Sequence, residues 1–318
     1  MIPLPPFTLL RPATLEEAAR LAAEPHARLI AGGTGLLPSL RQGIGAPRTL
    51  VSLEALEELR TIEAFQGGWR IGASVRLQEL ADRPEIPPAL REAARSVGAP
   101  GHRAAGTLGG NLCLDTRCIY YNQSEHWRRS NGYCLKLGGD TCHVAPQGRK
   151  CRAAYCGDLA PALLVLEAQV ETTVGSTPLE DLYRDDGASH LALAPGEIVS
   201  AVRLPAPQGR SGYAKARARG AIDYPLAGVA MALALREGRV ARLRVALTGT
   251  NSRPFLLAGT EVFVGAQPNE ATAAALVKLV QKQAAPMRTT VGAADYRRQA
   301  AAILARRLLE RLSKGELP

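Results

Sequence analysis

At 318 residues, 46% of them hydrophobic, the chain is long enough to form two domains with ordinary cores. Its net charge of +10 comes from dispersed lysines and arginines without interleaved aromatic residues, which argues against a nucleic-acid surface. The N-terminus lacks the pattern of a secretory signal peptide, and no apolar run is long enough to span a bilayer. We therefore expect a cytoplasmic protein that binds neither nucleic acid nor membrane.

Short strands and helices alternate at the start of the chain. Thr14 and Glu17 form a capping box that starts a helix. A strand over residues 27–31 leads directly into Gly32-Gly33-Thr34-Gly35 and a helix over residues 36–41. Glycines after a strand allow close backbone approach, and free N–H groups at a helix start bind phosphate, although many glycine turns bind nothing.

A second glycine turn follows the next set of elements. We expect strands over residues 49–53 and 69–72 and helices over 75–81 and 88–97. The turn Gly106-Thr107-Leu108-Gly109-Gly110 comes next and is followed by Asn111. Two turns that each present backbone amides favour a diphosphate ligand more than one turn alone would.

All six cysteines lie within one segment, at Cys113, Cys118, Cys134, Cys142, Cys151 and Cys156. Packing would scatter them, and disulfides are typical of small secreted domains. The spacing contains no C-x-x-C pair, so it matches neither an ordinary structural zinc site nor a ferredoxin. A metal ion or an iron–sulfur cluster is predicted, and the spacing leaves the choice open. His126 and His143 are either further ligands or ordinary polar partners.

The remaining sequence predicts the end of a first domain and then a second domain. A short apolar run over residues 160–165 precedes strands over 168–174 and 197–204, and residues 205–211 have the composition of a linker. Beyond it we expect strands over 229–235, 239–248 and 261–264 and helices over 271–284 and 295–312. The predicted domains cover residues 1–204, with a loop insertion over about 113–156, and residues 208–318.

Several motifs along the chain resemble those of one protein family. They are Ile30-Ala31-Gly32-Gly33-Thr34, Thr107-Leu108-Gly109-Gly110-Asn111, Gly157-Asp158, Pro195-Gly196-Glu197-Ile198 and Ala294-Asp295-Tyr296-Arg297. In this order they are similar to motifs of the flavoprotein subunits of the xanthine dehydrogenase and carbon monoxide dehydrogenase family. The resemblance implies an α+β fold, with a two-part FAD-binding domain that carries a cysteine-rich loop insertion and a smaller C-terminal α+β domain.

The resemblance also implies a set of FAD-binding residues. The FAD diphosphate would lie on the backbone of Ile30, Ala31, Gly32, Gly33, Thr34 and Gly35 and of Thr107, Gly109, Gly110 and Asn111. Asp158 would accept hydrogen bonds from hydroxyls of the cofactor. Lys215 would approach the flavin ring, unless it is an ordinary surface lysine. No residue of this chain would be catalytic, because the substrate would react on another subunit.

The cysteine segment is not general to that family. Through Cys113-Leu-Asp-Thr-Arg-Cys118 and Tyr120-Tyr-Asn-Gln123 it resembles an insertion in the flavin subunits of 4-hydroxybenzoyl-CoA reductases. The resemblance implies a [4Fe–4S] cluster held by Cys118, Cys134, Cys142 and Cys151. Cys113 and Cys156 would then be non-ligands whose roles the sequence leaves open.

The implied function is electron transfer in a molybdenum-dependent oxidoreductase that removes the phenolic hydroxyl of 4-hydroxybenzoyl-CoA to give benzoyl-CoA. Electrons from ferredoxin would pass through the [4Fe–4S] cluster and FAD to partner subunits. These partners would be a large subunit with the molybdenum cofactor and a small subunit with [2Fe–2S] clusters, assembled as a dimer of heterotrimers. One alternative is an oxidative FAD subunit of another molybdenum hydroxylase, similar to xanthine or carbon monoxide dehydrogenase. A non-catalytic zinc-binding or nucleic-acid-binding protein is the other alternative.

Overall fold

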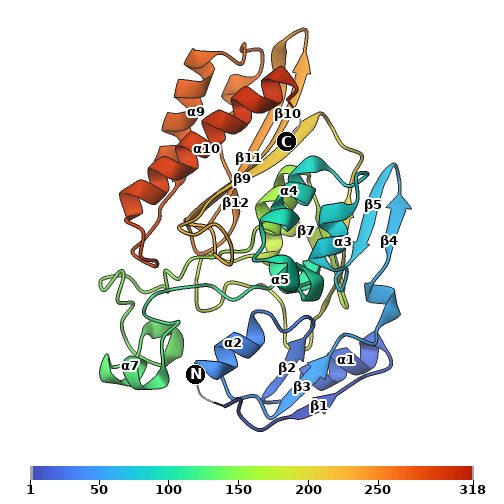
Figure 1. Cartoon of the computed structure of the whole chain (residues 1–318), viewed down its shortest axis with the longest axis vertical. Coiled ribbons are helices and arrows are strands. Elements are labelled where there is room, and N and C mark those ends of the chain that lie inside the picture. Colours follow the sequence, from blue (N-terminus) through green and yellow to red (C-terminus); the bar gives the residue numbers. More distant parts are fainter. Residues whose placement is uncertain (1–2, 317–318) are drawn as a thin grey trace.

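Three β-sheets with helices packed on them build the chain in the computed structural model, which describes residues 3–316 (Figure 1). A small parallel sheet lies at the bottom of Figure 1, and a four-stranded antiparallel sheet lies at the top. A five-stranded antiparallel sheet lies between them. The outermost residues of the two predicted domains, 1–2 and 317–318, fall outside the described residues. No helix within residues 3–316 is both long and apolar enough to cross a membrane.

The N-terminal sheet has the strand order β1-β3-β2, with all strands parallel. Its strands are β1 (Thr8–Leu10), β2 (Ala27–Ile30) and β3 (Thr49–Ser52), and its helices are α1 (Leu15–Ala22) and α2 (Leu36–Arg41). The cap at Thr14 is confirmed, because the Glu17 amide donates to Thr14 Oγ1 at 3.1 Å, whereas the Glu17 carboxylate accepts from the Ala13 amide at 2.9 Å, one residue before the cap. This cap directs the buried Ala18 of α1 onto Val51 of β3.

The middle sheet has the order β4-β5-β8-β6-β7. Its strands are β4 (Ile62–Phe65), β5 (Gly68–Gly72), β6 (Gln169–Thr172), β7 (Gly175–Pro178) and β8 (Val199–Leu204). The associated helices are α3 (Leu77–Asp82), α4 (Pro88–Ser96), α5 (Pro100–Ala105), α6 (Leu108–Leu112) and α8 (Leu159–Val165), with 3₁₀ turns η1 (Glu57–Leu59) and η3 (Leu179–Leu182). Every residue of α8 is buried, as its uniformly apolar sequence requires, so this helix lies at the centre of the main core.

The C-terminal sheet has the order β12-β11-β10-β9. Its strands are β9 (Arg210–Ala216), β10 (Ala227–Arg236), β11 (Arg239–Thr248) and β12 (Phe255–Leu256), and two long helices, α9 (Glu270–Gln283) and α10 (Ala294–Lys314), pack beside it. The strand predicted over residues 261–264 is wrong, because Thr260–Phe263 forms a 3₁₀ turn, η4. A short apolar run does not distinguish a strand from a turn, and here only Phe263 of that turn is buried.

The cysteine segment projects from the body between α2 and α10, in green at the lower left of Figure 1. Between Cys113 and Cys156 its regular structure is limited to α7 (Glu125–Ser130) and η2 (Leu135–Leu137). Arg117 and Ala154 exchange two backbone hydrogen bonds, of 2.7 and 2.8 Å, which close its base. The Ile119 amide also donates to the Thr289 carbonyl at 2.9 Å, so the segment is anchored on the C-terminal part of the chain.

Candidate functional site

The first glycine turn joins β2 to α2 and leaves its backbone donors free. Gly33 has a φ of +69°, a conformation that favours glycine. Within residues 3–316, the amides of the turn Gly32–Gly35 make no hydrogen bond to another protein group. A Cβ on Gly32 would lie 1.9 Å from the Ala105 carbonyl oxygen, so this turn packs tightly against the start of the second turn. Four adjacent free donors in a glycine turn suit an anionic ligand.

The second glycine turn is built differently, because the amides of Leu108, Gly109 and Gly110 are occupied. The Leu108 and Gly109 amides donate to the carbonyls of Val75 and Ala73 at 3.0 and 2.8 Å. The Gly110 amide donates to Thr107 Oγ1 at 3.1 Å and caps α6. These hydrogen bonds fix the shape of the turn. The three bonded amides would therefore not donate to a diphosphate, and the second turn would border such a ligand only through its close approach to the first turn.

Asn111 connects the second turn to the Gly157-Asp158 motif. Its side-chain oxygen, Oδ1, accepts a hydrogen bond from the Leu159 amide at 3.0 Å, at the start of α8. A Cβ on Gly157 would lie 2.7 Å from the Asn111 carbonyl oxygen, so glycine is needed for this close approach. The structure therefore brings three of the motifs found in the sequence to one place, although they lie far apart along the chain.

Asp158 and Lys215 form a buried ion pair, with both side chains about 4% exposed. Lys215 Nζ lies 3.1 Å from the Asp158 carboxylate and donates to the Ser96 carbonyl at 3.0 Å. The Tyr213 hydroxyl donates to the same carboxylate at 2.6 Å. Burial raises the pKa of Asp158, and the nearby Lys215 charge opposes that rise. The two residues predicted to face the cofactor thus contact each other, and Lys215 is not an ordinary surface lysine.

The four cysteines predicted as ligands line one hollow in the projecting segment, here called the cysteine pocket and formed by Cys118, Cys134, Cys142 and Cys151. All four side chains are buried. Burial raises the pKa of the Cys151 thiol to about 11 and also raises that of Cys118. Within residues 3–316, no three His, Cys, Asp or Glu side chains stand close enough to hold a single metal ion.

The other two cysteines lie outside this pocket. Cys113 packs against the main core and Cys156 is 1% exposed. Burial raises the pKa of their thiols to about 12 and about 11, which keeps them protonated and unreactive. All six cysteines have free thiols, so the disulfide alternative finds no pairing in this structure.

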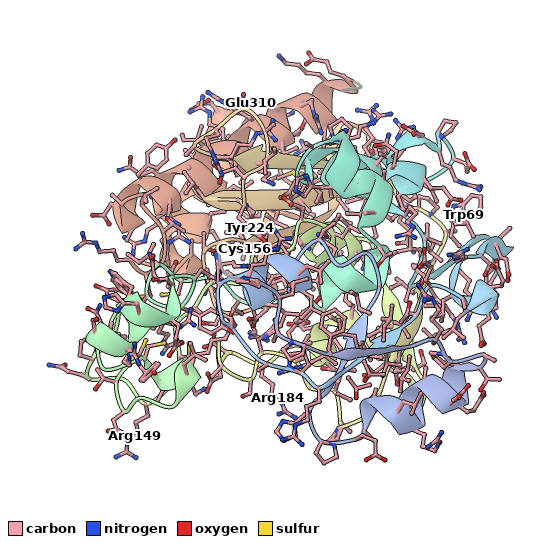
Figure 2. All side chains as sticks on the ribbon, turned by 60° about the horizontal axis from the view of Figure 1, so that its bottom comes forward. Trp69, Arg149, Cys156, Arg184, Tyr224 and Glu310 are labelled. Atoms are coloured by element: carbon pink, nitrogen blue, oxygen red, sulfur yellow. The ribbon has the colours of Figure 1, made fainter. Side chains whose placement is uncertain are left out.

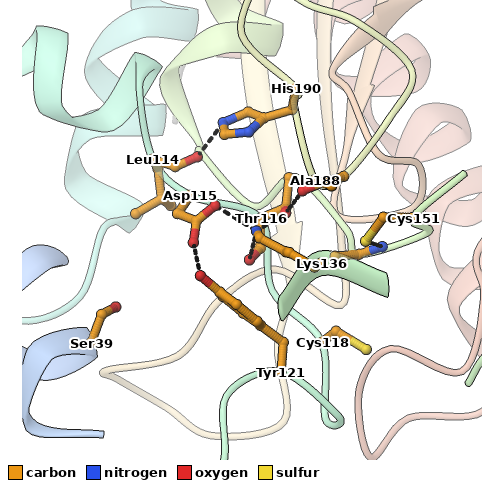
Figure 3. A network of polar contacts seen from close by, with 12 residues as sticks. Ser39, Leu114, Asp115, Thr116, Cys118, Tyr121, Lys136, Cys151, Ala188 and His190 are labelled. Carbon is orange, nitrogen blue, oxygen red and sulfur yellow. Dashed lines mark hydrogen bonds and ion pairs between the residues drawn. The ribbon is translucent and has the colours of Figure 1, made fainter. Parts of the chain in front are cut away.

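A network of polar side chains centred on Lys136 lies beside Cys118 and Cys151 of the cysteine pocket (Figure 3). Lys136 lies in its lining, with Nζ 2.5 Å from Asp115 Oδ1, 2.6 Å from Thr116 Oγ1 and 4.2 Å from the ring centre of Tyr121. The Tyr121 hydroxyl donates to the other Asp115 oxygen at 2.9 Å. Nothing in the local sequence distinguishes Lys136 from a solvated lysine, because Asp115 is far from it along the chain.

The two histidines of the segment differ in their surroundings. His126 is exposed. His143 lines the cysteine pocket, but its Nε2 hydrogen-bonds the Tyr133 carbonyl at 2.5 Å, and its ring centre lies 5.0 Å from that of Tyr120 with the two rings tilted by 34°. The surroundings of both histidines fit ordinary polar residues better than metal ligands.

Two family models match the chain in succession. The FAD binding domain in molybdopterin dehydrogenase matches residues 5–207, and the CO dehydrogenase flavoprotein C-terminal domain matches residues 211–312. The chain is 36% identical to the aldehyde oxidoreductase FAD-binding subunit PaoB of Escherichia coli (strain K12), over 82% of this chain and 87% of that subunit. It is 27% identical to the carbon monoxide dehydrogenase medium chain of Afipia carboxidovorans, over 96% of each chain.

The same fold is present in solved structures. A chain of a Cu,Mo-CO dehydrogenase in its cyanide-inactivated form superposes with a TM-score of 0.79 at 25% identity, over 98% of this chain and 99% of that one. The α+β fold expected from the resemblance is therefore confirmed, and the non-catalytic zinc or nucleic-acid alternative has no support. The chain belongs to the family of FAD-binding medium subunits of the xanthine dehydrogenases and carbon monoxide dehydrogenases.

Proposed function

We propose that the chain is the FAD-bearing electron-transfer subunit of a molybdenum hydroxylase that oxidises its substrate, with an aldehyde as the first substrate to test. The observation that carries this proposal is the 36% identity to an aldehyde oxidoreductase FAD-binding subunit over 87% of its length. The relatives described above give no support to the 4-hydroxybenzoyl-CoA reductase implied by the cysteine loop. Experiments on the direction of electron flow distinguish that reductive function from the oxidative one.

FAD fits the residues that the two glycine turns bring together. The four free amides of Gly32–Gly35 would hold the diphosphate, and the close backbone of Thr107–Asn111 would border it. Asp158 and Lys215 would lie beside the cofactor as an ion pair, so that each buried charge is neutralised by the other. When bound, FAD would accept electrons from the partner subunits and release them to an acceptor.

A [4Fe–4S] cluster is proposed for the cysteine pocket. Four buried thiols surround one hollow, while the other two cysteines lie outside it. A single zinc ion draws its sulfur ligands to about 2.3 Å from one centre, and no such group stands within residues 3–316. Four thiolate ligands are the set that a [4Fe–4S] cluster takes. The raised thiol pKa values imply that metal binding releases protons.

The partners proposed for this subunit are a large subunit with the molybdenum cofactor and a small subunit with [2Fe–2S] clusters. A relative of this length is called a medium chain in carbon monoxide dehydrogenase, which supports an assembly of several subunits. A dimer of heterotrimers in the cytoplasm completes the proposal. In the oxidative direction ferredoxin would act as acceptor rather than donor.

Replacing Gly33 tests the FAD site. Gly33→Val should abolish FAD retention, because a branched side chain would enter the turn at a φ of +69°. Gly238→Val is the matched control, since Gly238 has a φ of +73° with nothing within 4 Å, in the β10–β11 hairpin. Flavin absorbance after gel filtration measures retention. Stoichiometric FAD in Gly33→Val would contradict the site.

Gly109→Val is also predicted to lose FAD, but its effect on FAD binding is harder to separate from an effect on folding. A Cβ on Gly109 would lie 2.9 Å from the Ala73 Cβ and 3.1 Å from the Ala73 carbonyl oxygen. The substitution therefore disturbs packing between the turn and the middle sheet as well as the cofactor site. A circular dichroism melt of the variant separates a folding defect from a binding defect.

Six single Cys→Ser variants test the cluster. The variants at Cys118, Cys134, Cys142 and Cys151 should lose about four irons and the acid-labile sulfide per chain, because these thiols line the pocket. The variants at Cys113 and Cys156 are internal controls and should keep the iron. Zinc in place of iron, or a different set of four essential cysteines, would overturn the assignment.

The direction of electron flow is tested on the complex purified with its partner subunits. An aldehyde added without oxygen should bleach the flavin absorbance, because electrons then arrive from the partner subunits. The same complex given reduced ferredoxin and 4-hydroxybenzoyl-CoA should form no benzoyl-CoA. Benzoyl-CoA formation without any oxidation of aldehydes would restore the reductive function and overturn the oxidative one.

A further inference from the structure

Arg117 carries a positive charge and forms no ion pair with any carboxylate among residues 3–316. It directly precedes Cys118 in the cysteine segment. The ion pairs of that segment use Arg128, Lys136 and Arg152, and none formed within residues 3–316 includes Arg117. Its Nε is buried without a hydrogen-bond partner among the described residues. A partly buried guanidinium of this kind favours an anionic ligand.

The guanidinium of Arg117 reaches the first glycine turn. Its Nη2 lies 3.8 Å from the position that a Cβ on Gly35 would occupy, and Leu114 Cδ1 lies 3.3 Å from the same point. The cysteine segment therefore packs directly on the turn whose four amides are free. Free backbone donors and an arginine with no carboxylate partner among the described residues, at one place, are the two components of a phosphate site.

Two contacts hold the Arg117 side chain in position. The exchange of backbone hydrogen bonds with Ala154 fixes its main chain at the base of the segment. Its guanidinium lies over the Tyr224 ring, 4.8 Å from the ring centre. Figure 2 shows Tyr224 beside Cys156, where the loop after β9 meets the base of the cysteine segment. The side chain is thus oriented before any ligand binds, which reduces the entropy lost on binding.

We infer that Arg117 binds the diphosphate of FAD and that the cysteine segment thereby supplies part of the flavin site. This inference rests on the proposed FAD function and adds a residue that none of the glycine motifs contains. A planar guanidinium donates two parallel hydrogen bonds to a phosphate, which an ammonium group cannot do. FAD is therefore held jointly by the N-terminal sheet and by the segment that carries the cysteine pocket.

The test compares FAD dissociation from wild-type protein and three variants in the complex with its partner subunits, with iron content measured on the same samples. R117M should weaken FAD binding about 10- to 100-fold and keep the iron, because one charged hydrogen-bonding group is lost. R117K should recover part of the affinity. R152M is the control, since Arg152 lies in the same segment but pairs with Asp185 at the surface. Inorganic pyrophosphate should compete with FAD in the wild type and less well in R117M.

Each remaining outcome counts against the inference. Unchanged FAD affinity in R117M, with normal binding in the wild type, would overturn it and leave the proposed function intact. Loss of iron together with FAD in R117M would show that Arg117 acts by folding the segment, which also overturns it. A wild-type complex that binds no FAD would overturn the proposed function itself.

Discussion

His190 is a buried histidine whose protonation opposes folding. It is 7% exposed, and its Nε2–H donates to the Leu114 carbonyl at 3.0 Å (Figure 3). Burial lowers its pKa to about 4, with Lys136 acting in the same direction and Asp115 against it. In the unfolded chain the pKa is about 6.5. Its contribution to stability is therefore complete above about pH 6.5 and is lost as the pH falls toward 4.

We predict that H190Q removes this acid sensitivity. At pH 5 the wild type should lose about 2 kcal/mol of unfolding free energy relative to pH 7 through this residue alone. Glutamine keeps an N–H donor for the Leu114 carbonyl and does not titrate. Urea unfolding at both pH values measures the difference. Wild-type and H190Q stability curves that run parallel between pH 7 and pH 5 would contradict the prediction.

At the scale of elements, α10 is held to its neighbours by one buried arginine. Arg297 is 0% exposed and donates to the carbonyls of Leu226 at 2.9 Å and Met287 at 2.6 Å, and to that of Gly249. It also donates to Thr289 Oγ1 at 3.0 Å. The Thr289 carbonyl in turn accepts from Ile119, next to Cys118, so the same arginine orders the support of the cysteine segment.

We predict that R297M lowers the unfolding free energy by about 3 kcal/mol or more, because several buried carbonyls lose their donor. R298M is the matched control one residue along α10. The Arg298 side chain is 38% exposed and pairs with Asp295, so its loss should cost about 1 kcal/mol or less. Urea unfolding measures both variants, and soluble yield replaces it if R297M does not accumulate. Equal stability of the two variants would show that the buried bonds contribute little.

At the scale of the molecule, one core unites the regions matched by the two family models. Tyr213, Ala230 and Ala246 from the C-terminal sheet pack in the same cluster as α8 and the middle sheet. Glu92 of α4 accepts from the Tyr213 amide at 2.7 Å and pairs with Arg311 of α10 at 2.8 Å. The Asp158–Lys215 pair joins the same two regions. Unfolding of one region therefore exposes the core of the other.

A double-mutant cycle on Asp158 and Lys215 tests this connection. D158N or K215M alone should each cost about 3–5 kcal/mol, because each leaves one buried charge without its partner. The double variant should lose clearly less than the sum of the two single losses. Chemical denaturation of all four proteins gives the coupling energy. If the two single losses of unfolding free energy add up to that of the double variant, the two side chains stabilise the fold independently and the ion pair itself contributes nothing.

Local features of this protein were predictable from its sequence. The cap at Thr14, the glycine turn after β2, the helices α9 and α10 and the concentration of cysteines all depend on neighbours within a few residues or on composition. The order of the motifs indicated the family through its resemblance to known flavoprotein subunits, and the glycines in those motifs stand where the backbone must approach closely. The turn at residues 260–263 was missed, because a short apolar run has no distinctive period.

Only the tertiary structure decided which groups pair with which. It bonds the Leu108 and Gly109 amides of the second glycine turn to the carbonyls of Val75 and Ala73, and within residues 3–316 it leaves the amides of the first turn free. It joins Asp158 to Lys215 and separates four pocket cysteines from two core cysteines. It also places Arg117 on the turn at Gly35. Such pairings depend on distances between segments remote in sequence, and those distances exist only after the sheets have assembled around the shared core.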